Sequence, residues 1–494
     1  MTNRSLGADV LRTSECGDAA SKRPPSRSLL PGLRGPNALA GLDTDEPWVA
    51  AVELFRTRNP RRRDRIADYE RLLATGDHRR AGAAVLAGAY QPEPPVEGWL
   101  NKADGRKKRV FQYPPADELL FRVVNQLLQP AAAEAASPWC RSFLPGGGAR
   151  TAFRAVLLDP DIEAKAALRL DVRDYFNSID VDDLLACLPF TDAPVVRLLE
   201  ASLRDRRIVR HGAVVDGGRK GVMAGTPIAP MLATLYLRDL DAEVAGAGAT
   251  YARYSDDILV LAPPAELPAL EWLIRLRLNE RGLAINEAKS AVAAPGEPWD
   301  FLGFRYCNTA GAGVIGLAPI TVRKLKARST RLARRLLRWR QRTGAPPEPA
   351  LAAYVRRMNR RIYGAPAERT DFSWATWFLP LLDRCDELEV LDEWLLREAR
   401  YAATGMRTGR ARRLVPYEAL VGAGHYPLVA AYWTMRREPA TYDSAVARRT
   451  ALARPATVSS SSPLVSSTTS PTTTSDRPSS AADAVNARWS GSRR

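Results

Sequence analysis

The sequence has few of the residues that build zinc sites and disulfide frameworks. Among 494 residues there are 3 histidines and 5 cysteines, and the cysteines are scattered without a CxxC pair. A zinc-dependent nuclease and a disulfide-stapled domain are therefore disfavoured, and we expect a cytoplasmic protein in a reducing compartment. Long apolar runs are also missing, so the sequence predicts no membrane-spanning helix.

Acidic residues are in deficit as well. Asp and Glu number 55 against 72 Lys and Arg, which leaves a formal net charge of +17. Such an excess favours a polyanionic partner, with nucleic acid as the first candidate and an acidic membrane surface as the second. We therefore expect a nucleic-acid partner and no membrane.

Composition divides the chain into five segments. Residues 1–45 form a basic segment rich in Ser, Pro and Gly, and residues 455–494 form a tail rich in Ser, Thr and Pro. Neither has enough apolar residues to offset its ordering entropy, so both are expected to be disordered. Residues 46–165 are predicted to be mainly helical, residues 166–310 contain strands with interleaved helices, and residues 311–454 are helical and very basic. This order predicts an α+β fold, with α/β as the alternative.

Acidic residues stand at the ends of two predicted strands. Asp171 ends the apolar run LRLD, and Asp256 with Asp257 forms the turn of RYSDDILVL. An Asp-Asp pair in a hairpin is ordinarily only a turn. A buried strand that ends in Asp needs a partner for its charge, however, and two such elements side by side would cluster three carboxylates. Hard cations such as Mg²⁺ favour these ligands, and two ions about 3.5–4 Å apart can clamp an in-line phosphoryl transfer.

Further segments agree with this interpretation, and together they resemble the reverse transcriptase family. The upstream stretch NKADGRKKRVFQYPPADELLFRVVNQLLQP resembles the fingers motifs of that family. The segments that resemble its successive palm motifs are LRLDVRDYFNSID (168–180), GVMAGTPIAPMLATLYLRDLD (221–241), YARYSDDILVLA (251–262), RGLAINEAKS (281–290) and FLGFRY (301–306).

The resemblance implies a right-hand polymerase. Its fingers would lie within residues 46–165, and its palm, an antiparallel sheet with helices, within 166–310. A helical thumb and a C-terminal helical domain would occupy 311–454. The implied activity is RNA-directed DNA synthesis from dNTPs on an RNA template, with two Mg²⁺ ions (or Mn²⁺) as cofactors and transfer to a 3′-hydroxyl.

The resemblance also assigns the centre of the site. Asp171 and Asp256 match the metal-ligating aspartates, and Asp257 matches the neighbouring acid. Phe176 matches the aromatic steric gate that excludes a ribose 2′-hydroxyl, although a core aromatic is the alternative. We expect Tyr175 to point the other way on an extended segment.

Other matching residues surround this centre. Lys289 matches the lysine proposed to protonate pyrophosphate, where a positioned acid would help because charge develops on the leaving group. Lys107 and Arg109 match the basic fingers strand that holds the triphosphate. Gly225 and Pro227 match the turn before the helix that lies under the nascent base pair. The alternatives are a solvated lysine for Lys289 and a solvated loop for residues 106–109.

The segment 323–342 is unusually basic, with ten Lys and Arg and no acid. In a polymerase this would be the thumb helix that follows the nucleic-acid backbone through phosphate contacts, the alternative being a solvated face. The residues on which this expectation depends are Arg331, Arg334, Arg335 and Arg338.

Departures from the family narrow the subgroup. Met223-Ala224-Gly225 stands where mobile-intron enzymes carry Pro-Gln-Gly, and neither a retron Val-Thr-Gly nor an H-N-H endonuclease pattern is found. The sequence thus resembles the solitary prokaryotic reverse transcriptases, many of which are linked to phage defence. A dedicated non-coding RNA or a protein partner is a further option for this protein. The alternatives are untemplated or protein-primed DNA synthesis, a group II intron-like or retron-type enzyme, an RNA-copying RNA polymerase, and an inactive nucleic-acid-binding scaffold.

Overall fold

The computed structural model describes residues 38–437, apart from gaps at 102–106, 219, 310–311 and 365–372. Most of the two segments predicted to be disordered lies outside the described residues. Residues 38–45 are described and form turns, in which Leu39 and Leu42 are fully buried. Folded structure thus begins before residue 46, the start that composition predicted, because these two leucines reach the core.

The N-terminal part combines helices with a small sheet. A four-stranded sheet has the order β2-β1-β4-β5, in which β1 pairs with β2 antiparallel and meets β4 in parallel. Its strands are β1 (Val96–Asn101), β2 (Lys107–Gln112), β4 (Arg207–Arg210) and β5 (Ala213–Asp216). The helices of this part are α1 (Glu46–Arg58), α2 (Arg63–Thr75), α3 (Asp77–Leu86), α4 (Pro115–Ala135), α7 (Val181–Cys187) and α8 (Ala193–Leu203). A buried face of α4 joins them to the main core.

A second four-stranded sheet, wholly antiparallel, forms the centre of the fold. Its order is β6-β7-β3-β8, with β3 (Ala166–Asp171), β6 (Thr250–Tyr254), β7 (Asp257–Ala262) and β8 (Ala291–Ala293). Alternate residues of its strands face two different hydrophobic cores, with Leu168 and Val260 in one, Ala167 and Leu261 in the other. Both faces are therefore covered, which explains why β7 is continuously apolar after Asp257.

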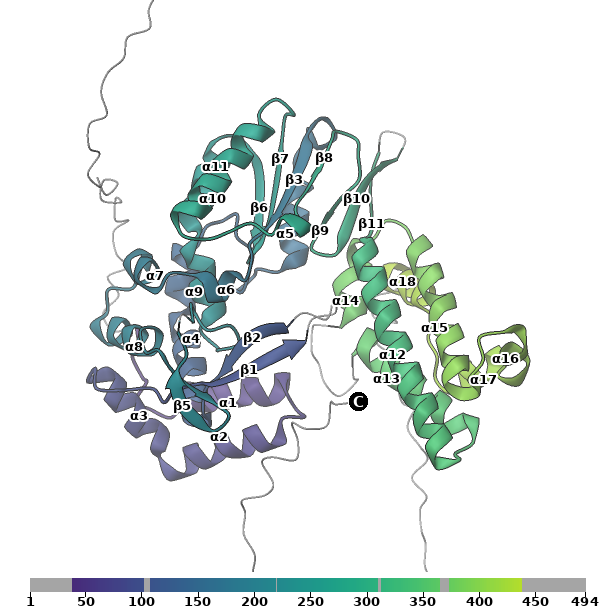
Figure 1. The fold of residues 1–494 in the computed structure, drawn as a ribbon, viewed down its shortest axis with the longest axis horizontal. Helices are drawn as coiled ribbons and strands as arrows, with labels where there is room; N and C mark the ends of the chain where they lie inside the picture. The colour runs from purple at the N-terminus through teal and green to yellow at the C-terminus, as the bar shows by residue number, and fades with distance from the viewer. Residues whose placement is uncertain (1–37, 102–106, 219, 310–311, 365–372, 438–494) are drawn as a thin grey trace, which may run out of the picture. The chain divides into compact units, whose positions relative to one another are not determined.

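Helices connect and cover the strands of the central sheet. Helix α10 contacts β6, and α11 contacts β3 and β7 (Figure 1). The elements are α5 (Ala149–Val156), η1 (Ile162–Ala164), α6 (Tyr175–Ser178), α9 (Ala229–Tyr236), α10 (Arg238–Gly246), α11 (Leu267–Glu280) and η2 (Glu287–Lys289). Antiparallel and mixed sheets with interleaved helices agree with the predicted α+β class.

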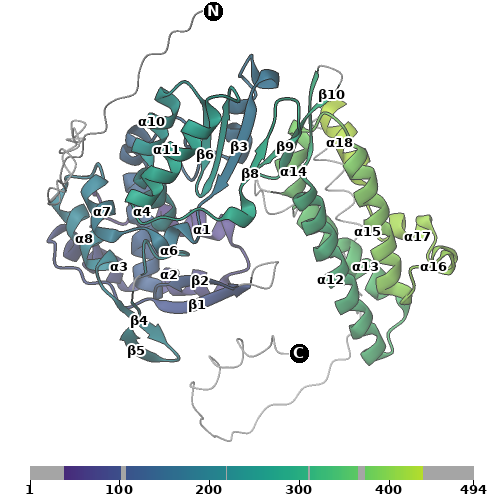
Figure 2. The same ribbon diagram turned by 45° about the horizontal axis from the view of Figure 1, so that its top comes forward.

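The C-terminal part begins with a three-stranded antiparallel sheet, β11-β10-β9, and continues as helices. Helices α12, α13 and α15 pack against one another and share the second core with the sheet (Figure 2). The elements are β9 (Trp299–Phe301), β10 (Phe304–Thr309), β11 (Ala312–Leu317), α12 (Pro319–Thr343), α13 (Pro347–Tyr363), α14 (Trp374–Phe378), η3 (Leu379–Leu381), α15 (Asp386–Thr404), α16 (Gly409–Leu414), α17 (Tyr417–Gly422) and α18 (Leu428–Arg437). In the described part of the chain, no helix is both long enough and apolar enough to span a membrane.

Candidate active site

The three aspartates singled out from the sequence come together at one end of the central sheet. Asp171, the last residue of β3, is the direct antiparallel partner of Asp257, the first residue of β7. Asp256 lies in the turn between β6 and β7, and its carbonyl accepts a hydrogen bond of 3.0 Å from the Val172 N–H. Segments far apart in sequence are thereby fixed side by side through backbone pairing.

The electrostatics of this cluster are those of crowded, buried carboxylates. Burial raises the pKa of Asp257 to about 7, and repulsion from Asp256 and Asp171 adds to the rise. Burial, followed by repulsion from Asp171, also raises the pKa of Asp256. Keeping all three ionised therefore costs free energy that a nearby cation would offset.

One such cation is Lys289, which the structure places at the cluster. Its Nζ lies 2.5 Å from Oδ2 of Asp171, and its side chain is 45% exposed. Asn286 holds the same aspartate, because its Nδ2 donates to Oδ1 at 2.9 Å and its backbone N–H donates to the Asp171 carbonyl at 2.7 Å. The sequence analysis did not single out Asn286, although it stands three residues before Lys289 in the same motif.

The residues offer the right donor chemistry for a hard divalent cation, since all three are carboxylates with oxygen donors. In the described part of the chain, however, no group of three or more His, Cys, Asp or Glu side chains is arranged as a metal site. One oxygen of Asp171 is paired with Lys289 instead. The three carboxylates therefore fit a divalent ion in their chemistry.

Phe176 lies on α6, a single helical turn rather than the extended segment predicted. The ring of Phe176 meets the ring of Tyr175 edge-on, with centroids 5.9 Å apart. Tyr175 itself is buried, and its hydroxyl donates to the Ala233 carbonyl at 2.6 Å. Asp174 precedes this helical turn and has a φ of 43°, so the chain leaves the extended conformation there. The prediction that Tyr175 and Phe176 lie on an extended segment is therefore wrong.

The three basic residues at the start of strand β2, Lys107, Lys108 and Arg109, have different surroundings. Arg109 donates to Glu97 Oε1 at 2.5 Å and to the Gly217 carbonyl at 2.8 Å. Lys107 is exposed at the start of the strand. Lys108 has its Nζ 5.1 Å from the Phe176 ring centroid, and its charge offsets a part of the rise that burial and Asp171 cause in the pKa of Asp256. Strand alternation could have indicated Lys108, because it faces opposite to both neighbours.

The turn that contains Gly225 and Pro227 packs against β2. Gly225 has a φ of 105°, and a Cβ there would stand 2.9 Å from the Phe111 carbonyl oxygen. The Phe111 N–H donates to the Ala224 carbonyl at 2.8 Å, so the close approach is part of a backbone contact. Asn177 of α6 also binds this turn, with its Oδ1 accepting from the Ala224 N–H at 3.3 Å. Pro227 lies two residues before α9 and is half-buried.

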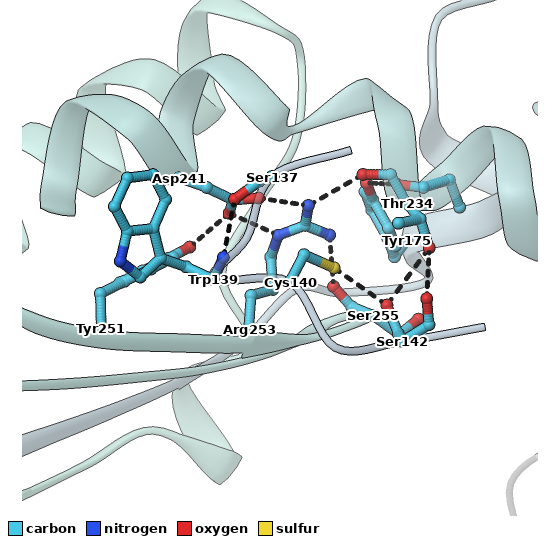
Figure 3. A network of polar contacts seen from close by, with 11 residues as sticks. Ser137, Trp139, Cys140, Ser142, Tyr175, Thr234, Asp241, Tyr251, Arg253 and Ser255 are labelled. Carbon is cyan, nitrogen blue, oxygen red and sulfur yellow. Dashed lines mark hydrogen bonds and ion pairs between the residues drawn. The ribbon is translucent and has the colours of Figure 1, made fainter. Parts of the chain in front are cut away.

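A buried ion pair of Arg253 and Asp241 lies next to the turn between β6 and β7, where Arg253 reaches Ser255 (Figure 3). Arg253 and Asp241 both have side chains with 0% exposure, and they form two bonds, at 2.6 Å and 2.7 Å. The guanidinium also donates to the carbonyls of Thr234 at 2.9 Å and Ser255 at 3.3 Å. Ser255 has a φ of 60°, so the pair supports a residue in the left-handed region directly before Asp256.

The four arginines predicted to bind nucleic acid are exposed on α12 and line a groove of about 1210 Å³. Further arginines of α13 and of the loop after α1 line the same groove, and no acidic residue is among the described residues that line it. Burial, followed by the like charges of Arg328 and Arg331, lowers the pKa of Arg361. This concentration of positive charge is suited to a polyanion.

The clustered strand-end carboxylates and the nearby lysines have the chemistry that suits a divalent cation and a triphosphate. Comparison with protein families agrees: residues 102–306 match the family model described as reverse transcriptase (RNA-dependent DNA polymerase). The matched segment includes every aspartate of the cluster and ends at Tyr306. The protein is therefore an RNA-directed DNA polymerase, a nucleotidyltransferase. A comparison with curated proteins finds no match.

Proposed function

We propose that the protein copies RNA into DNA at the cluster of Asp171, Asp256 and Asp257, adding dNTPs to a primer 3′-hydroxyl. The observation that carries this proposal is the antiparallel pairing of Asp171 with Asp257, with Asp256 in the adjoining turn, inside the matched segment. Two Mg²⁺ ions, or Mn²⁺, held by these carboxylates would supply activation of the hydroxyl and stabilisation of the leaving pyrophosphate.

The basic residues have separate roles in this proposal. Lys289 lies against Asp171 and is suited to give a proton to the leaving pyrophosphate. Lys108 reaches the side of the site where Phe176 lies and is suited to hold the triphosphate together with Lys107. Arg109, bound to Glu97, would act mainly by holding β2 in place.

We further propose a right-hand arrangement with fingers at 46–165, a palm at 166–310 and a thumb with further helices at 311–454. Gly225 and Pro227 would shape the surface under the nascent base pair. The α12 arginines would contact phosphates of the RNA template and DNA product, a role supported by their exposure in an acid-free groove. Phe176 would exclude ribonucleotides by a clash with the 2′-hydroxyl.

The central test is Asp256→Asn, which removes a carboxylate and keeps the side chain's size. We expect polymerisation on an RNA template with Mg²⁺ to fall by about 10³-fold or more, because metal-assisted charge stabilisation supplies several kcal/mol. Nucleic-acid binding and thermal stability should change little. Asp216→Asn on the exposed hairpin is the matched control and should retain full activity. A near-wild-type rate for Asp256→Asn would refute the assignment.

Template use and biological role need their own measurements. Sequencing the products made with and without added RNA separates templated synthesis from untemplated or protein-primed synthesis. The resemblance to solitary prokaryotic enzymes supports a role in phage defence. Bacteria expressing the wild-type chain should then resist phages that plate normally on cells expressing Asp256→Asn, and equal plating on both would refute that role.

A further inference from the structure

The segment that precedes α5 is attached along the edge of the central sheet. Cys140 forms a parallel bridge with Arg253 of β6. The Arg253 N–H donates to the Trp139 carbonyl at 3.0 Å, and the Arg141 N–H donates to the Arg253 carbonyl at 3.2 Å. The backbone of residues 139–141 is thus fixed to the strand that leads into the catalytic turn.

The next residue, Ser142, anchors the segment on its other side (Figure 3). Its side chain is fully buried, and its Oγ lies 3.2 Å from Oγ1 of Thr234 on α9 and 3.0 Å from Sγ of Cys140. Thr234 returns a bond of 3.3 Å to the Ser142 carbonyl. The backbone of Arg141 is held by β6, and Ser142 is held by Thr234 of α9. The position of the residue that follows Ser142 is therefore determined by the sheet and by α9.

That following residue is Phe143, and it is set apart from the core. Its backbone has a φ of 57°, and its side chain is 40% exposed. The ring nevertheless contacts two rings of the site: it meets Phe176 edge-on with centroids 6.3 Å apart, and it lies against Tyr254 with centroids 5.7 Å apart. Phe143 therefore links the proposed sugar gate to the tyrosine of the catalytic turn.

We propose that Phe143 is a positioning residue for sugar discrimination, acting by holding the ring of Phe176. This inference rests on the proposed gate role of Phe176. A gate rejects a 2′-hydroxyl only if its ring cannot move aside, so its support matters as much as its size. Phe176 packs against the first hydrophobic core, and its ring also contacts Tyr175, the long and flexible Lys108, and Phe143 on an anchored segment.

The experiment compares kcat/KM for a dNTP and for the matching rNTP in wild type, in Phe143→Ala, Phe143→Tyr, Phe176→Ala and the double alanine variant, and in one control variant. We expect Phe143→Ala to reduce the preference for dNTP by about 2- to 13-fold, the range that ring–ring contacts support. Phe143→Tyr should retain the preference. The double variant should discriminate no worse than Phe176→Ala alone, because Phe143 acts through Phe176. Trp272→Ala, at a 65% exposed ring on α11, is the control and should leave the preference unchanged.

The outcomes separate this inference from the function on which it rests. If Phe176→Ala leaves the preference unchanged, the gate assignment itself is wrong. If Phe176→Ala relaxes the preference but Phe143→Ala does not, only the positioning role is overturned. An equal slowing of both nucleotides in Phe143→Ala would show a merely structural role and would also overturn it. Phe143→Leu keeps apolar volume without the ring and repeats the test should the alanine variant unfold.

Discussion

The buried ion pair of Asp241 and Arg253 allows a sharp test of how this fold is held together. Asp241→Asn keeps the shape of the side chain and removes its charge, which leaves the Arg253 guanidinium at 0% exposure without a counter-ion. Two hydrogen bonds to carbonyls stay in place, but neither supplies negative charge. The variant should therefore be strongly destabilised although nothing is removed from the hydrophobic core.

The size of the effect follows from the burial of the pair. Removing one partner of a fully buried pair costs about 3–5 kcal/mol, because the other charge is left desolvated. Since 1.4 kcal/mol is a factor of ten, the ratio of folded to unfolded protein should fall by about 150- to 5,000-fold. With an unfolding entropy of about 2.1 cal/mol/K per residue over roughly 400 folded residues, the Tm should drop by about 4–6 °C.

Calorimetry supplies the measurement, and the chain offers a matched control. Glu243 and Arg277 also form a two-bond pair, at 2.7 Å, but their side chains are 37% and 35% exposed. Glu243→Gln should cost less than about 1 kcal/mol, because water screens both charges. The double variant Asp241→Leu with Arg253→Met should cost less than the sum of its single changes. Equal losses for Asp241→Asn and Glu243→Gln would refute the reasoning.

Three further predictions follow from other parts of the molecule. Replacing the four α12 arginines with Gln should lower the magnitude of the slope of log affinity against log salt by up to about 4, because each phosphate contact that is lost removes the release of about one counterion on binding. An unchanged slope would show that nucleic acid binds elsewhere on the protein. Gly221→Ala should lower the unfolding free energy more than Gly76→Ala: both residues have positive φ, but a Cβ would stand 2.2 Å from the Phe176 carbonyl oxygen in the first and meet nothing within 4 Å in the second. Burial raises the pKa of Asp392 to about 6 from 3.8, so its contribution to stability is greatest at low pH and is lost as pH rises through 6. Between pH 4 and 7, the free energy of unfolding of Asp392→Asn should therefore rise relative to that of wild type by at most about 3 kcal/mol. A difference between the two proteins that does not change with pH would contradict this.

The sequence by itself determined the central sheet and the aspartates at its end. The run DILVLA is apolar on both strand faces after its aspartate, so burial between two cores was built into its composition. An aspartate that ends such a run is costly without a partner, which made Asp171, Asp256 and Asp257 stand out before any coordinates. The basic, acid-free stretch 323–342 was equally visible, and the structure turns it into α12 with its charges outside.

Only the tertiary structure decided which neighbouring side chains reach those aspartates. Arg109 and Lys108 are adjacent in sequence, yet Glu97 on the paired strand binds the first and leaves the second near Phe176. The contact of Lys289 with Asp171 depends in the same way on a partner more than a hundred residues away. Local propensity sets helices, strands and apolar faces, because it acts over a few residues. Which polar groups pair in a site depends on the three-dimensional proximity of distant segments, and that is fixed only when the sheets and helices pack.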